Sequence, residues 1–156
     1  MRRVLVAIIM ALFVQYLLGI AVNLFVTIPT SHPGARPPEY FGGVVQSVTW
    51  AMLQGPILLQ AHAGFGLLLV VGTAAVAVRA WPLGGRMLRW TTVLGAVSVL
   101  AAGFNGGSFL NYNEDFSSMI MASLFALAVA CYILALYALS DSPPLGGGVR
   151  PKAGRG

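Results

Sequence analysis

The chain has 156 residues, of which 58% are hydrophobic and only 8% are charged, and its mean hydropathy is +0.83. Soluble domains carry about a quarter charged residues, so this composition excludes a water-soluble domain and indicates a membrane protein. The net charge of +5 does not indicate a nucleic-acid partner, because the basic residues stand at the ends of apolar segments and do not gather in one stretch.

The first apolar segment, residues 4–28, follows Arg2 and Arg3. A helix rises about 1.5 Å per residue, so a helix over this segment is long enough to cross a hydrocarbon core of about 30 Å. A cleaved signal peptide is the alternative, since basic residues precede the segment and a small-residue site lies at Gly19 and Ala21. The apolar run continues well past that site, beyond the roughly 7–15 residues of a signal core. We therefore expect an uncleaved first span.

Three further spans are predicted at residues 56–78, 88–104 and 116–139. The connection after the first span, residues 29–38, is rich in proline, which excludes a regular helix there. Between this connection and the second span, residues 44–54 are apolar with interspersed polar side chains. They form either a short helix along the membrane surface or an extension of the second span.

The basic residues indicate the direction of the spans. All of them except Arg36 lie before the first span, between the second and third, or after the fourth, whereas Glu39, Glu114 and Asp115 lie on the other side. Because cytoplasmic loops carry the excess of arginine and lysine, both termini are expected in the cytoplasm. The predicted fold class is all-α: a polytopic membrane protein whose residues 1–140 form a four-transmembrane-helix bundle. Residues 141–156 are expected to form a disordered basic tail.

The direction of the spans also places their polar residues by depth. Asn23, His62 and Asn105 all fall in the outer third of the bundle, where polar side chains are expected to face one another and not lipid. His62 is a possible haem ligand, because an imidazole nitrogen can bind iron and Gly64 and Gly66 leave room for a ring to approach the backbone. The alternative is a structural histidine that hydrogen-bonds Asn23 or Asn105.

Other chemistry finds little support. A haem with two histidine ligands needs a second histidine at comparable depth, but the only other histidine, His32, lies in the proline-rich connection. The second axial ligand of a haem would therefore have to be Met119 or Met121. The single cysteine, Cys131, excludes an internal disulfide and a thiolate cluster. No G-x-S-x-G, H-E-x-x-H or P-loop motif is present. No charged residue lies in the middle of a span, which argues against a proton relay or an ion-coupled transporter.

Residues 105–115 form a polar, glycine-rich stretch between the third and fourth spans. Gly106 and Gly107 are expected to form the turn that ends the third span, and Asn113 or Asp115 to cap the start of the fourth. Capping leaves several polar residues of the stretch without a role. The alternative is a pocket for a small polar ligand or a cation, lined by Asn23, His62, Asn105, Asn111, Glu114 and Asp115.

Three motifs carry a resemblance to known proteins: Ala61-His-Ala-Gly-Phe-Gly66, Asn105-Gly-Gly-Ser-Phe-Leu110 and Asp115-Phe-Ser-Ser-Met-Ile-Met-Ala122. On these motifs, from the second span to the fourth, the chain resembles the small four-span membrane proteins of unknown function found widely in bacteria. That resemblance implies a four-helix bundle in a bacterial plasma (inner) membrane. The helix that begins near His62 is also similar to one in four-helix modules of the cytochrome b and haem A synthase kind, which implies haem as a cofactor.

Three functions are compatible with this sequence. The first is a non-enzymatic membrane protein that serves as an accessory or assembly partner, since alanine and glycine are frequent at residues 72–77 and 94–98 and small residues allow helices to approach closely. Its partners would be the lipid bilayer and other membrane proteins or a second copy. The second is a haem- or quinone-associated redox module that uses His62. The third is the small-ligand or cation binder.

Overall fold

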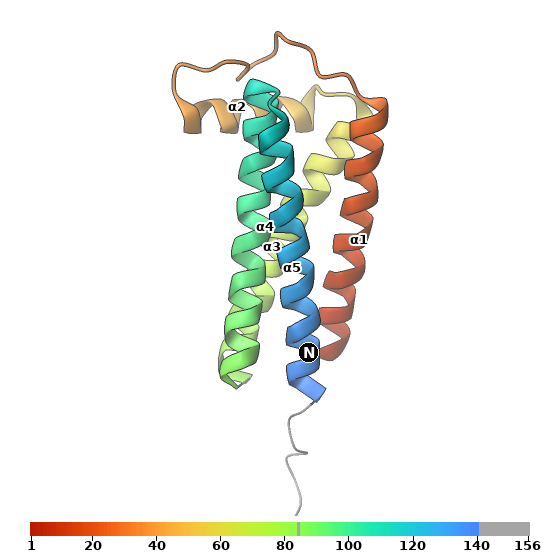
Figure 1. Ribbon diagram of the computed structural model, residues 1–156, viewed down its shortest axis with the longest axis vertical. Helices are drawn as coiled ribbons and strands as arrows, with labels where there is room; N and C mark the ends of the chain where they lie inside the picture. The colour runs from red at the N-terminus through yellow and green to blue at the C-terminus, as the bar shows by residue number, and fades with distance from the viewer. Residues whose placement is uncertain (84, 141–156) are drawn as a thin grey trace, which may run out of the picture.

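The computed structural model describes residues 1–83 and 85–140 and is all-helical over this part of the chain (Figure 1). Its elements are α1 (Arg2–Phe25), α2 (Tyr40–Leu53), α3 (Ile57–Leu83), α4 (Arg86–Tyr112) and α5 (Asp115–Ser140). The 4 long helices are long and apolar enough to cross a membrane. This confirms the prediction of a helical protein with four candidate spans. The tail predicted at residues 141–156 lies outside the described residues.

The four long helices pack side by side in an up-and-down bundle (Figure 1). The contact between α4 and α5 is the most extensive; α3 packs on α4 and α1, and α1 packs on α5. Helix α1 begins at the end of the bundle where α5 finishes. The short helix α2 lies across the opposite end and contacts α3 and α4.

The core of the bundle is narrow, and much of the apolar surface faces outward. Leu68 and Val78 on α3 are 68% and 72% exposed, and Phe13 on α1 is 54% exposed. Helices that are apolar on every face are suited to a lipid bilayer. The larger buried cluster consists of Leu5, Leu12, Leu69, Val76, Ala80, Leu88, Val99, Ala128, Tyr132 and Ala135. A smaller cluster beneath α2 consists of Ala51, Leu59 and Leu110.

The predicted turn at Gly106 and Gly107 is wrong, because α4 continues through both residues to Tyr112. A Cβ at Gly107 would lie 2.7 Å from Val44 Cγ1 on α2, so this glycine allows two helices to approach closely inside a continuous helix. The turn falls instead at Asn113, which adopts the left-handed conformation (φ 54°, ψ 43°). Asparagine tolerates this conformation better than most residues.

Other boundaries differ by smaller amounts. Helix α1 ends at Phe25 and not at residue 28, since Ile28 precedes Pro29 and a residue before proline is disfavoured in a helix. Helix α3 continues beyond residue 78 to Leu83. Residues 44–54 do not extend the second span, because α2 is a separate helix that ends before Gly55.

Candidate functional site

A group of hydrogen-bonded polar residues, which includes His32, Ser47 and Asn111, lies at the end of the bundle opposite the start of α1. Here the connection after α1 and the helix α2, together residues 29–53, cover the ends of α3 and α4; we call them the cap segment. Glu39 begins α2, and its carboxylate accepts hydrogen bonds from the backbone N–H groups of Phe41 and Gly42 at 2.8 and 2.5 Å. The opposite face of the helix, Gly43, Val44, Ser47 and Ala51, is buried against the bundle.

Asn111, near the end of α4, is the centre of the contact with the cap segment. Its side chain is only 2% exposed. Three carbonyl oxygens surround the amide: those of Gly34 and Gly43 at 3.1 Å and that of Gly107 at 3.2 Å. Only the amide nitrogen can donate to carbonyl groups, so Nδ2 faces them and Oδ1 accepts from the Val44 N–H at 3.2 Å. One side chain therefore joins the connection, α2 and α4.

Two further contacts reinforce this junction. Ser47 Oγ lies 2.6 Å from the Asn111 amide, and the backbone N–H of Arg36 donates to the Asn111 carbonyl oxygen at 2.9 Å. Gly34 has a φ of +89° and packs directly on the backbone of α2, where a Cβ would collide with Ser47 Oγ. Gly43 likewise has no room for a Cβ because Pro37 occupies that space. The junction therefore depends on glycine at both positions.

His32 attaches the connection to the bundle at a second point. Its ring stacks on Trp50 of α2 with centroids 4.3 Å apart and an angle of 14° between the planes. Nδ1 lies 2.9 Å from the Pro33 carbonyl oxygen and Nε2 lies 3.1 Å from that of Leu110. Whichever nitrogen carries the ring proton can donate it to a carbonyl group. This histidine is thus engaged in holding the cap segment in place.

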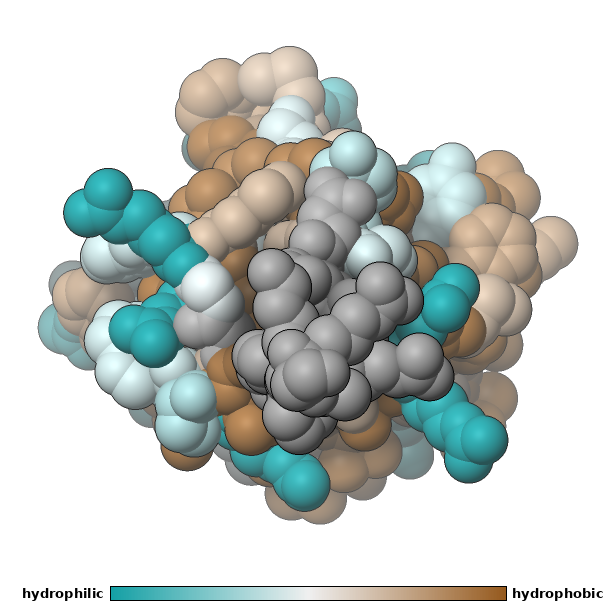
Figure 2. All heavy atoms as spheres, turned by 90° about the horizontal axis from the view of Figure 1, so that it is seen from below, coloured by the Kyte–Doolittle hydropathy of each residue, from teal (hydrophilic) through white to brown (hydrophobic). Residues whose placement is uncertain are grey.

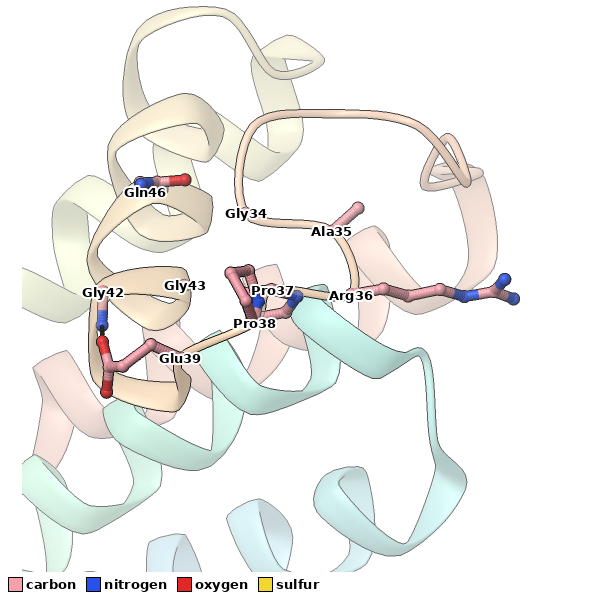
Figure 3. Close-up of a pocket in the computed structure, with 9 residues that line it drawn as sticks. All are labelled: Gly34, Ala35, Arg36, Pro37, Pro38, Glu39, Gly42, Gly43 and Gln46. Carbon is pink, nitrogen blue, oxygen red and sulfur yellow. Dashed lines mark hydrogen bonds between the residues drawn. The ribbon is translucent and has the colours of Figure 1, made fainter.

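The cap segment has two shallow hollows. One, of about 250 Å³, lies between the connection and the start of α2 (Figure 3). The Arg36 side chain extends away from it, and the Glu39 carboxylate turns towards the N–H of Gly42. The other, of about 230 Å³, is a mainly apolar groove beside Trp50 and Leu53. Neither hollow brings together the acids, bases or nucleophiles that catalysis requires.

A second polar contact lies within the bundle, between α1 and α3. Gln15 Nε2 donates to the His62 carbonyl oxygen at 3.1 Å and lies 3.5 Å from His62 Nε2. Gly19 and Gly66 make room for the pair: a Cβ at Gly19 would lie 3.2 Å from His62 Cε1, and one at Gly66 would lie 3.0 Å from Gln15 Nε2. Gln15 Oε1 and His62 Nδ1 are buried without a partner. The pair is a polar contact between helices of the kind that stabilises membrane bundles.

The contacts of the two histidines bear on the predicted haem, which stays a prediction. An iron bound to His62 Nε2 would need the place that Gln15 Nε2 occupies, and Nδ1 is enclosed beside Gly19. The second histidine, His32, is held in the cap segment with each ring nitrogen near a carbonyl oxygen. Among residues 1–83 and 85–140, no group of three or more histidine, cysteine, aspartate or glutamate side chains could hold a metal ion.

We expect full-length protein purified from haem-replete cells to show no Soret band, because His62 pairs with Gln15. The measurement is an absorption spectrum of the detergent-purified protein with and without dithionite. A Soret band that His62→Ala removes and His32→Ala retains would contradict this expectation and support the haem hypothesis.

No side-chain hydrogen bond joins any two of the six residues predicted to line a pocket. Asn23 is exposed near the end of α1, and Glu114 and Asp115 are exposed at the turn between α4 and α5. Asn105 donates to the Ala101 carbonyl oxygen of its own helix at 3.0 Å. His62 contacts Gln15 and not an asparagine, and Asn111 is buried beneath the cap segment. Whether these residues bind a ligand stays a prediction.

Sequence reasoning did not identify Gln15, Gly34 or Ser47 as partners in these contacts. For Gln15 a signal exists, since Gln15 and Gly19 are one turn apart and form a polar, small stripe on one face of α1. For Gly34 and Ser47 the sequence offers no comparable signal, because their role depends on how the connection folds back over α2.

Comparisons with protein-family models, with curated proteins and with solved structures return no match for this chain. The fold alone defines the class of protein: it is a helical, membrane-type protein with four apolar helices and a polar cap segment at one end. The resemblance to small four-span bacterial proteins rests on the sequence motifs and on these helices alone.

Proposed function

We propose that this chain is a non-enzymatic integral membrane protein that serves as an accessory or assembly partner through its helix faces. Two glycines of the long helices support this most directly. A Cβ at Gly64 on α3 or at Gly103 on α4 would meet no atom within 4 Å, so neither glycine is needed for packing within the bundle. In a membrane, small residues on an open helix face allow a second helix to approach closely.

The other helix glycines differ in this respect. Gly19, Gly66 and Gly95 each have a side chain of a neighbouring helix within 3.2 Å of the position that a Cβ would occupy. Around Gly64, the outward face of α3 consists of large exposed apolar residues, including Leu67, Leu68 and Val71. A glycine beside these bulky side chains allows a second helix to approach the backbone of α3 closely. The face of α3 is therefore the proposed contact surface.

Photo-crosslinking tests the contact surface. A photoreactive residue at Leu68, which is 68% exposed and one turn from Gly64, is expected to form a discrete adduct in native membranes. Gly64→Leu should abolish the adduct, whereas Gly64→Ala should retain it. Since a Cβ at this position meets no neighbour, Gly64→Leu should change the protein's own stability by no more than about 0.5 kcal/mol.

An adduct of twice the chain's mass would identify a second copy, and another mass would identify a different membrane protein. Absence of any discrete adduct, or an adduct that Gly64→Leu leaves intact, would exclude this face as the contact surface.

We further propose that the protein resides in a bacterial plasma membrane with both termini in the cytoplasm. The support is charge: Arg2, Arg3, Arg79, Arg86 and Arg89 lie at the end where α1 begins. The cap segment carries Glu39, and the nearby turn carries Glu114 and Asp115. An excess of arginine on one side of the spans is typical of the cytoplasmic side.

Cysteine labelling of intact cells tests this orientation. In a Cys131→Ser background, a membrane-impermeant thiol reagent is expected to label Glu114→Cys, because this exposed turn faces the outside in the proposed orientation. Gly85→Cys, exposed between α3 and α4, should react only after the membrane is opened. Labelling of Gly85→Cys and not Glu114→Cys in intact cells would reverse the orientation.

A further inference from the structure

Helix α2 has an apolar side that the bundle covers only in part. Val44 and Val48 face α4, since a Cβ at Gly107 would lie 2.7 Å from Val44 Cγ1 and 3.2 Å from Val48 Cγ2. Phe41 stands almost two helical turns before Val48, so it shares this face of α2. Its side chain is nevertheless 65% exposed, because the first turn of α2 extends beyond α4 at the end of the bundle (Figure 1).

The Phe41 ring lies against the outer side of α4. It meets the ring of Phe104 edge to face, with centroids 6.4 Å apart and 86° between the planes. Phe104 is itself exposed, and Val97 and Leu100 continue the same exposed apolar face along α4. The exposed apolar surface of α4 is therefore continuous with that of α2.

The height of this contact along the bundle matches the thickness of a bilayer. Helix α4 rises about 27 Å between Arg86, where it begins, and Phe104. At the end of the bundle where α4 begins, hydrophilic side chains stand around the rim (Figure 2). A hydrocarbon core is about 30 Å thick. With one boundary of that core at this rim, the Phe41 ring lies just inside the other boundary.

Gln46 marks the opposite side of α2. It is exposed and lies two positions from both Val44 and Val48, so it points away from the bundle. Helix α2 itself carries no charged side chain. The carboxylate of Glu39, which precedes the helix, accepts hydrogen bonds from backbone N–H groups of the first turn, Phe41 among them. A short helix that places an apolar side chain towards the hydrocarbon and a polar one away from it is suited to the bilayer interface.

We propose that α2 lies in the headgroup region of the bilayer, with Phe41 inserted among phospholipid acyl chains beside α4. Lipid is the occupant of this surface because the surface continues the exposed apolar face of α4, which borders lipid in an integral membrane protein. Gln46 remains on the aqueous side of the helix. This inference rests on the proposed function and adds the lipid surface as the partner of the cap segment.

Spin-label accessibility in phosphatidylcholine vesicles tests this placement. A nitroxide is attached to Phe41→Cys or Gln46→Cys in the full chain with Cys131→Ser, and EPR measures its collisions with oxygen and with a water-soluble nickel chelate. Oxygen concentrates in hydrocarbon, so the ratio of oxygen to chelate collisions should be several-fold higher at Phe41→Cys than at Gln46→Cys. Both positions are exposed on one helix, which makes them a matched pair. Phe13→Cys, near the middle of α1, reports insertion of the bundle.

The same measurement distinguishes failure of this inference from failure of the proposed function. Equally low ratios at Phe41→Cys and Gln46→Cys, with a high ratio at Phe13→Cys, would place α2 in water and overturn the inference alone. A low ratio at Phe13→Cys would overturn the proposed membrane insertion itself.

Two further results would overturn lipid as the occupant or the interface as the location. A Phe41→Cys label that neither reagent reaches would show that a second copy covers this surface. A high ratio at Gln46→Cys would place the whole of α2 within the hydrocarbon. If Phe41→Cys does not fold, Val45→Cys, which is exposed one turn further along α2, replaces it and must give a higher ratio than Gln46→Cys.

Discussion

Asn111→Asp is expected to lower the free energy of unfolding by about 3–5 kcal/mol, the range for an uncompensated buried charge. The carboxylate has almost the shape of the amide but no N–H group. It would place an oxygen 3.1 Å from the carbonyl oxygens of Gly34 and Gly43 and 3.2 Å from that of Gly107. Because the side chain is only 2% exposed, water cannot relieve the repulsion between these oxygens. The cap segment should separate from α4.

Asn113→Asp is the matched control for this prediction. It makes the same chemical change two positions further along, at an exposed turn residue whose left-handed backbone aspartate also tolerates, and should alter stability by no more than about 0.5 kcal/mol. Unfolding in mixed micelles of increasing denaturing detergent gives the free energies. Hydrogen exchange over residues 29–53 reports release of the cap segment directly. Equal stability of the two variants would show that the Asn111 amide does not hold the cap segment.

Gly95→Leu is expected to disrupt the interface between α4 and α5, at a cost of about 3 kcal/mol or more. Even a Cβ at Gly95 would lie 2.8 Å from Tyr132 Cε2, 3.0 Å from Tyr132 Cζ and 3.3 Å from Cys131 Cβ. Tyr132 is fully buried in the core, so its ring has no free space into which it can turn. The larger leucine side chain can enter only if the two helices separate.

Gly103→Leu provides the comparison, because a Cβ there meets no atom within 4 Å. On the same helix, the same substitution should leave the thermal midpoint in detergent close to that of wild type. Thermal unfolding followed by circular dichroism measures both variants. A Gly95→Leu protein as stable as Gly103→Leu would show that α4 and α5 do not pack through Gly95.

The number of spans could be predicted from the sequence, whereas the position of the turn between α4 and α5 could not. The four candidate spans were predicted from long apolar runs, and the structure has the same number of long apolar helices. The turn at Gly106 and Gly107 was predicted wrongly because glycine serves two purposes, to end a helix and to allow close approach. Contact with Val44, distant in sequence, decides which purpose applies at Gly107.

The partners of the polar residues were equally hard to predict. His62 is a half-buried polar residue of α3, and its partner is Gln15 and not Asn23 or Asn105. Hydropathy gives the depth of each residue but not the order of helices around the bundle, and it is the packing of α1 on α3 that brings Gln15 to His62. Asn111 is buried for a similar reason, since proline in residues 29–38 excludes a helix without indicating where the connection lies.

The cap segment also has a consequence for the order in which the chain can assemble during synthesis. Ser47 and Asn111, whose side chains lie 2.6 Å apart, are separated by 64 positions in the sequence. A ribosome finishes α2 well before it makes the end of α4, so Ser47 has no Asn111 to bind until both α3 and α4 have been made. The contact between the cap segment and α4 can therefore form only after the α3–α4 hairpin has been synthesised.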